Sequence, residues 1–143
     1  MLSCLKELLG AGVAGDAGGR GEQLAADWLR RERSFVVVAR NWRSPRDRRD
    51  EIDLVCRDGD ALVFVEVKTR APGALVPGYY AVDERKKRVL LRTAKAYLAR
   101  LREKPPTFRL DVVEVALPGG PAGAEPAILH FENVPLFPKD FRV

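Results

Sequence analysis

Two carboxylates and a lysine lie in a pair of adjacent apolar segments, where charged side chains are costly to bury. Asp53 belongs to the first segment, and Glu66 and Lys68 lie two residues apart in the second. The second segment is apolar on both faces from Leu62 to Val65, which predicts a central strand of a covered sheet. Buried charges must be paired or bind a metal. The pattern therefore predicts either a divalent cation shared by the carboxylates, with Lys68 beside it, or an ion network without chemistry.

A tight turn joins the two segments. Asp58-Gly59 between apolar runs is typical of a β-hairpin. Side chains alternate along a strand, so Asp53 shares a face with Glu51, and Glu66 shares a face with Lys68. The hairpin is therefore expected to bring the carboxylates of the two strands together.

Composition predicts one globular domain and permits a polyanionic partner. The chain has 143 residues and a formal net charge of +5. That length is enough for a single core, and the charge is compatible with nucleic acid. Cys4 and Cys56 are far apart and lack metal-ligand spacing, which favours free thiols in a reducing cytoplasm. No segment has the length of a membrane span, so no membrane partner is expected.

Residues 1–17 are rich in glycine and alanine and are expected to be flexible or loosely docked. A secretory signal is disfavoured because a basic start is missing and Lys6 interrupts the apolar run. Residues 18–143 are expected to form the single domain. Hydrophobic periodicity and turn residues within it predict the order α-β-β-β-α-β-β, which is an α/β fold with a central mixed sheet flanked by helices. The main segments are the helices near 18–29 and 83–101 and the strands near 35–39, 51–58, 61–70, 108–117 and 127–131.

Basic side chains gather near the hairpin. The loop at 43–50 leads directly into the Glu51–Asp53 strand, and the helix at 83–101 has an N-cap residue, Asp83, and one strongly basic face. Both are expected to contact phosphates, although a solvated surface is the simpler alternative. Glu22 lies in the first turn of the first helix, where an acidic residue can merely complement the helix dipole. The loop at 71–80 is long enough to be functional, and its role stays open.

Several motifs taken together resemble the YraN-like family of small bacterial proteins. That family is similar to the restriction-endonuclease-like PD-(D/E)XK nucleases, and among them to archaeal Holliday-junction resolvases. The match extends over roughly 18–137. It rests on Gly18-x-x-Gly21-Glu22-x-x-Ala25, Asn41-Trp-Arg43, Glu51-Ile-Asp53, Glu66-Val-Lys68-Thr-Arg70, Ala81-Val82, Lys86 to Leu90, and Leu110-Asp111-Val-Val-Glu-Val. One departure is the loop before Ala81, where Val76 and Tyr80 replace the glycine and glutamate usual in the family.

The resemblance implies a restriction-endonuclease-like fold and a role for each matching position. The catalytic set would be Glu22, Asp53, Glu66 and Lys68. Mg²⁺ or Mn²⁺ would be held by Asp53 and Glu66, by the backbone carbonyl of Val67, and by Glu22 directly or through water. Nucleic-acid contacts would come from Arg20, Asn41, Arg43, Arg70, Lys86 and Lys87.

The expected function is a metal-dependent endonuclease that hydrolyses phosphodiester bonds in DNA rather than RNA, with branched or structured DNA as the candidate substrate. A symmetric junction would suit a homodimer. The alternative is a non-catalytic nucleic-acid-binding or adaptor module of the same fold. A third alternative is a structural interaction protein, in which Glu66 and Lys68 form an ion network with no metal affinity.

Overall fold

The computed structural model describes residues 17–71, 82–119 and 124–143. Two sequence-based expectations fall almost wholly outside these ranges. They are the loosely docked N-terminal segment, of which only Ala17 is described, and the functional loop at 71–80, of which only Ala71 is described.

Seven elements follow one another in the described chain, in the predicted order α-β-β-β-α-β-β. They are α2 (Ala17–Arg33), β1 (Val36–Arg43), β2 (Glu51–Asp58), β3 (Ala61–Arg70), α3 (Glu84–Arg100), β4 (Thr107–Ala116) and β5 (Ala127–Val134). The structure confirms the α/β class and the mixed sheet flanked by helices.

The strands form one sheet in sequence order, from β1 to β5. β3 and β4 run parallel, whereas the other neighbouring strands are antiparallel. A parallel neighbour requires a crossover connection, which α3 provides between β3 and β4. β3 is therefore the central strand, and the run Leu62–Val65 is buried, as its apolar character predicted.

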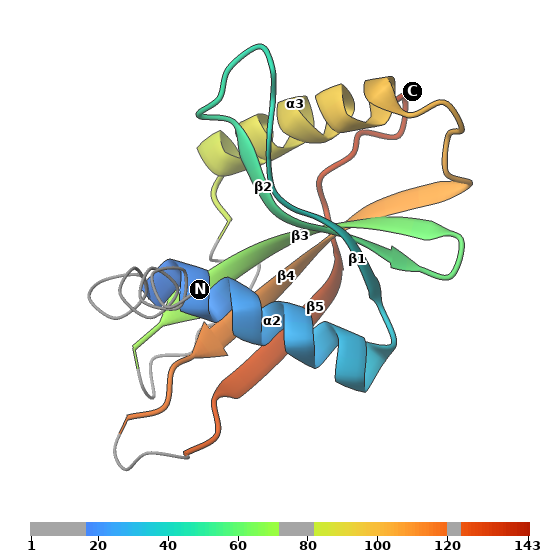
Figure 1. Ribbon diagram of the computed structural model, residues 1–143. Coiled ribbons are helices and arrows are strands. Elements are labelled where there is room, and N and C mark those ends of the chain that lie inside the picture. Colours follow the sequence, from blue (N-terminus) through green and yellow to red (C-terminus); the bar gives the residue numbers. More distant parts are fainter. Residues whose placement is uncertain (1–16, 72–81, 120–123) are drawn as a thin grey trace, which may run out of the picture.

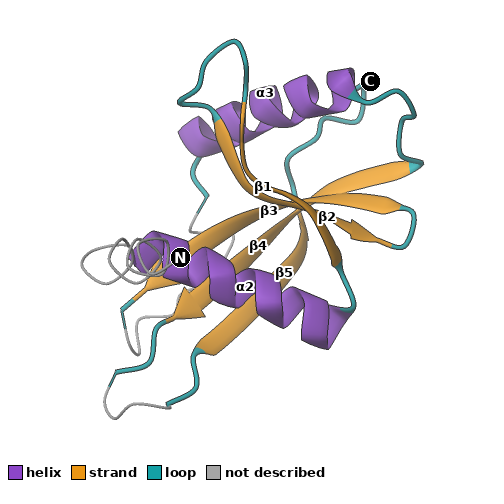
Figure 2. Cartoon of the chain, in the orientation of Figure 1, coloured by secondary structure: helices purple, strands orange, loops and turns teal. Residues whose placement is uncertain are grey.

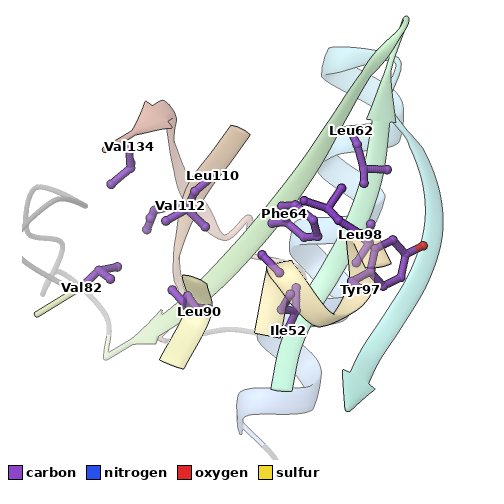
Figure 3. Packing of buried hydrophobic residues seen from close by; sticks show 12 residues of the cluster. Ile52, Leu62, Phe64, Val82, Leu90, Tyr97, Leu98, Leu110, Val112 and Val134 are labelled. Atoms are coloured by element: carbon purple, nitrogen blue, oxygen red, sulfur yellow. The ribbon is translucent and has the colours of Figure 1, made fainter. Parts of the chain in front are cut away.

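The two helices cover opposite faces of the twisted sheet (Figures 1 and 2). Alternate residues of β3 supply the two cores: Phe64 packs on the α3 side with Leu98, and Val65 packs on the α2 side with Leu29. Figure 3 shows the α3-side core, where side chains of β2, β3, β4 and β5 meet the helix. None of the described helices combines the length and the apolar character needed to cross a bilayer.

The first turn of α3 is fixed by its N-cap. Asp83 accepts a hydrogen bond from the backbone N–H of Lys86 at 2.8 Å, which satisfies a donor that the helix itself leaves unpaired. Farther along, the buried face packs on the sheet through Leu90, Thr93, Ala94, Tyr97 and Leu98. The cap and this face together determine which side chains α3 presents to the charged end of β3.

Gly59 makes the turn between β2 and β3. Its φ is +57°, a conformation that L-residues with a side chain adopt at a cost, and a Cβ there would meet nothing within 4 Å. Gly59→Ala is therefore expected to lower the free energy of unfolding by about 1 kcal/mol through backbone strain alone. Asparagine tolerates this conformation better, so Gly59→Asn should lose less. Urea unfolding of the two variants checks this order, and equal losses would contradict it.

Candidate functional site

The β2–β3 pairing opens where the polar residues begin. The ladder extends from Asp58–Ala61 to Leu54–Val65, and one further step of the register sets Asp53 opposite Glu66. There the Asp53 Oδ2 accepts the Val67 backbone N–H at 2.8 Å, so a side chain takes the place of a backbone partner. The N–H and C=O of a strand residue point to the same side, so the Val67 carbonyl also faces the Asp53 side.

Asn41 on β1 connects two further carboxylates to this point. By the β1–β2 register it lies opposite Asp53, and its φ of +47° is one that asparagine tolerates better than most residues. Its side-chain amide donates one hydrogen bond to Glu22 Oε2 at 2.7 Å and another to Glu51 Oε1 at 2.8 Å. Arg43 holds the second Glu51 oxygen at 2.8 Å. Asn41 and Arg43, which the resemblance made candidates for phosphate contacts, thus bind protein carboxylates in this structure.

Glu22, Glu51 and Asp53 each offer an oxygen within 4.8 Å of the other two. Glu22 and Asp53 are predicted site residues, whereas Glu51 was not among them. The signal for Glu51 was present, because it lies two residues before Asp53 and alternation places both on one face. All of the donors are carboxylate oxygens, which are the ligands that hard divalent cations take.

A close helix–strand contact sets the position of Glu22. Gly21 is buried against β3, and a Cβ added to it would overlap Thr69 Oγ1 and lie 3.1 Å from Thr69 Cβ. Only glycine lets the first turns of α2 approach the strand so closely. The next residue is Glu22, so this contact places its carboxylate over the site.

Glu66 is held between two lysines. Its side chain is 4% exposed, and Oε1 lies 3.3 Å from Lys68 Nζ on β3 and 3.4 Å from Lys86 Nζ on α3. The other oxygen, Oε2, is buried and has no hydrogen-bond partner among the described residues. Leaving a buried charged oxygen unpaired is costly. Glu66 therefore keeps one acceptor available for a ligand.

Burial beside other carboxylates raises the pKa of Asp53 from 3.8 to about 8. Burial is the main cause, followed by the charges of Glu66 and Glu22, while the Val67 N–H and Lys86 oppose the rise. At neutral pH the proton on Asp53 relieves the repulsion. A bound cation would relieve it in the same way and leave the carboxylate ionised.

Three predicted nucleic-acid residues lie apart from these contacts. Arg70 pairs with the fully buried Glu114 at 3.7 Å, and Lys87 pairs with Glu84 at 3.7 Å. Arg20 is exposed on the first turn of α2. The structure thus brings Glu22, Asn41, Arg43, Asp53, Glu66, Val67, Lys68 and Lys86 into one connected set.

Comparison with known proteins agrees with the motifs. A family model described as "Uncharacterised protein family UPF0102" matches residues 21–115, which include every residue of the connected set. A UPF0102 protein of Geobacter metallireducens is 39% identical over 116 residues, covering 81% of this chain and 88% of that protein. UPF0102 protein STH1475 of Symbiobacterium thermophilum is 48% identical over 98 residues, covering 68% of this chain and 80% of that protein. The chain therefore belongs to the UPF0102 family, which confirms the YraN-like membership predicted from its motifs.

Proposed function

We propose that the protein is a metal-dependent endonuclease that hydrolyses phosphodiester bonds in DNA, with branched or structured DNA as its substrate. The observation that carries this proposal is a cluster of three carboxylates, Glu22, Glu51 and Asp53, where the β2–β3 ladder opens. Glu66 lies opposite Asp53 by register and is paired with two lysines. The resemblance to PD-(D/E)XK nucleases adds support, because Asp53, Glu66 and Lys68 fall on the positions of that motif.

The residues fit Mg²⁺ or Mn²⁺. Asp53 and Glu66 would hold it, with Glu22 and Glu51 within reach of Asp53 and the Val67 carbonyl on the same side. The bare Glu66 Oε2 is a buried acceptor without a partner among the described residues, and the charges of Glu66 and Glu22 add to the effect of burial on the pKa of Asp53. When bound, such an ion lowers the pKa of a water and offsets charge on the scissile phosphate.

The lysines supply the remaining chemistry. Lys68 Nζ and Lys86 Nζ approach Glu66 from different elements. A phosphate bound to a cation on Glu66 would therefore lie near both ammonium groups. Lys68 would donate a hydrogen bond that orients the attacking water, and Lys86 would donate to a non-bridging phosphate oxygen. The side-chain amide of Asn41 holds Glu22 and Glu51 at a fixed spacing by donating a hydrogen bond to each carboxylate.

A second candidate function is a nucleic-acid-binding module without turnover. The contacts of Glu66 Oε1 favour it, because two lysines already offset that charge and can hold the site together without an ion. A binding module alone, however, gains nothing from a buried Glu66 facing a phosphate. The endonuclease is therefore the better-supported function.

Cleavage of labelled DNA tests the proposal. The wild type is expected to cut a four-way junction, a flap or a duplex only with Mg²⁺ or Mn²⁺ present, and Glu66→Ala should lower the rate at least about 100-fold. Glu103→Ala removes an exposed glutamate and is the matched control, with an unchanged rate. Binding without metal-dependent cutting, equal in wild type and Glu66→Ala, would favour the binding module.

A further inference from the structure

A groove separates the β1–β2 loop from the outer face of α3. Its volume is about 840 Å³, and Phe141 near the C-terminus lines it with a ring that also packs on Phe108 and Phe137. Figure 1 shows the loop rising beside α3 and the C-terminus lying near the end of the same helix. Carbon-rich side chains line much of it, among them Pro45, Leu91, Ala96 and Phe141. None of these residues belongs to the carboxylate site.

Positive charge dominates the rim of the groove. Four cationic side chains line it, Arg46, Arg88, Arg92 and Lys95, against two carboxylates, Asp47 and Asp50. Both carboxylates are already paired. Arg49 holds Asp47, and Arg92 binds Asp50 with two hydrogen bonds of 2.6 and 2.8 Å.

The unpaired cations share one side of the helix. Arg88 and Lys95 lie seven residues apart on the exposed face of α3, so they follow the same stripe. Within the described parts of the chain, Arg46, Arg88 and Lys95 have no ion-pair partner. Arg88 and Lys95 contribute nothing evident to the stability of the fold. They are available to an anionic ligand.

Residues of the groove neighbour residues of the carboxylate site on two elements. Asp50 lines the groove and Glu51, the next residue, belongs to the carboxylate cluster. On α3, Lys86 contacts Glu66 and Arg88 lines the groove two residues later. A strand bound at the carboxylates would therefore have the groove along α3 close to it.

We propose that this groove binds an unpaired strand of nucleic acid next to the carboxylate site. Single strands are bound by basic grooves that track the backbone together with apolar or aromatic surfaces that receive the bases. In a duplex the bases are stacked and paired, so binding depends mainly on contacts of basic side chains with the phosphates. The apolar lining and Phe141 thus favour an unpaired strand over a duplex, which makes a flap or a junction arm the substrate class. The inference deepens the proposed endonuclease function and names its substrate.

Binding without metal separates this inference from catalysis. Fluorescence anisotropy of a labelled oligothymidylate in EDTA is expected to show saturable binding by the wild type, and weaker binding of a duplex of the same length. Arg88→Ala/Lys95→Ala should weaken binding of the oligothymidylate about 10-fold and lower the slope of log affinity against log salt by about 2. Phe141→Leu keeps apolar bulk but removes the aromatic face. It should lower the affinity for the single strand about 5-fold and leave the affinity for the duplex unchanged.

Two controls make the result specific. Arg30→Ala/Arg31→Ala removes the same charge from α2, on the opposite face of the sheet, and should leave the affinity unchanged. Glu103→Ala removes an exposed charge at a position that does not line the groove, and should also bind the oligothymidylate like the wild type. Binding without metal-dependent cutting would overturn the endonuclease and support the groove. A duplex bound as tightly as the single strand, or an Arg88→Ala/Lys95→Ala variant that binds like the wild type, would overturn the groove even if the protein cuts DNA.

Discussion

Gly21→Ala is expected to lower the free energy of unfolding by about 1–3 kcal/mol, although alanine is the better helix former by about 1 kcal/mol. The added methyl would overlap Thr69 Oγ1. Turning the threonine side chain would not relieve the clash, because Thr69 Cβ lies only 3.1 Å from the new atom. The first turns of α2 must then move away from β3. Urea unfolding followed by circular dichroism measures the loss.

A second-site change tests the cause. Thr69→Ala removes Oγ1 and Cγ2, so Gly21→Ala/Thr69→Ala should be less destabilised than the sum of the single variants. Gly18→Ala adds a methyl at an exposed position of the same helix and should be neutral or slightly stabilising. Additivity of the two single changes would show that the contact between Gly21 and Thr69 is not what holds α2 in place.

The same displacement would reach the carboxylate site, because Glu22 follows Gly21. Its hydrogen bond from Asn41 would lengthen, and the spacing of Glu22 from Asp53 would change. If these carboxylates bind Mn²⁺, Gly21→Ala should lower the rise in melting temperature that Mn²⁺ produces in the wild type. Gly18→Ala should retain that rise.

The elements could be predicted because their signals are local. The apolar run at Leu62–Val65, the Asp58-Gly59 turn and the Asp83 N-cap each lie within a few residues, and each has the predicted structure. The Asp53–Glu66 proximity also followed, since a two-residue turn fixes the register of a hairpin. These signals were enough for the order of the elements and for the hairpin part of the site.

The rest of the site depends on contacts between distant elements. Lys86 was predicted to bind nucleic acid, yet it lies against Glu66 because the packing of α3 brings its first turn to β3. Asn41 meets Glu22 only after α2 folds over the sheet through Gly21. Hydrophobic periodicity in the sequence does not indicate which helix will contact which strand. The partners of these polar side chains could therefore not be derived from residue spacing.

Asp53→Asn is expected to raise stability at neutral and mildly basic pH. The folded-state pKa of Asp53 is about 8 against 3.8 for the ordinary carboxyl, so between these values the folded state binds a proton that the unfolded state has released. Stability from this group therefore falls as pH rises through that window. Asparagine does not titrate and retains an oxygen that can accept the Val67 N–H.

The size of the stability gain from Asp53→Asn follows from the interval between the unfolded-state and folded-state pKa values of Asp53. One pKa unit corresponds to about 1.4 kcal/mol, so the advantage of Asp53→Asn over the wild type should grow by at least about 2 kcal/mol between pH 5 and pH 8. Urea unfolding across this range measures it. Asp60→Asn, a change at an exposed aspartate in the β2–β3 turn, should show no such trend. A constant difference between Asp53→Asn and the wild type at all pH values would contradict the raised pKa.

Metal connects this stability effect to function. Mn²⁺ at pH 8 should stabilise the wild type, because an ion that binds only the folded state raises stability by mass action, and should stabilise Asp53→Asn much less. The stability gap between the two proteins should then narrow. Under the proposed function, Asp53→Asn should also lose metal-dependent cleavage. A variant that is more stable and inactive would mean that Asp53 is retained for chemistry at a cost to the fold. A variant that is more stable and responds to Mn²⁺ like the wild type would instead make Asp53 a residue of the ion network alone.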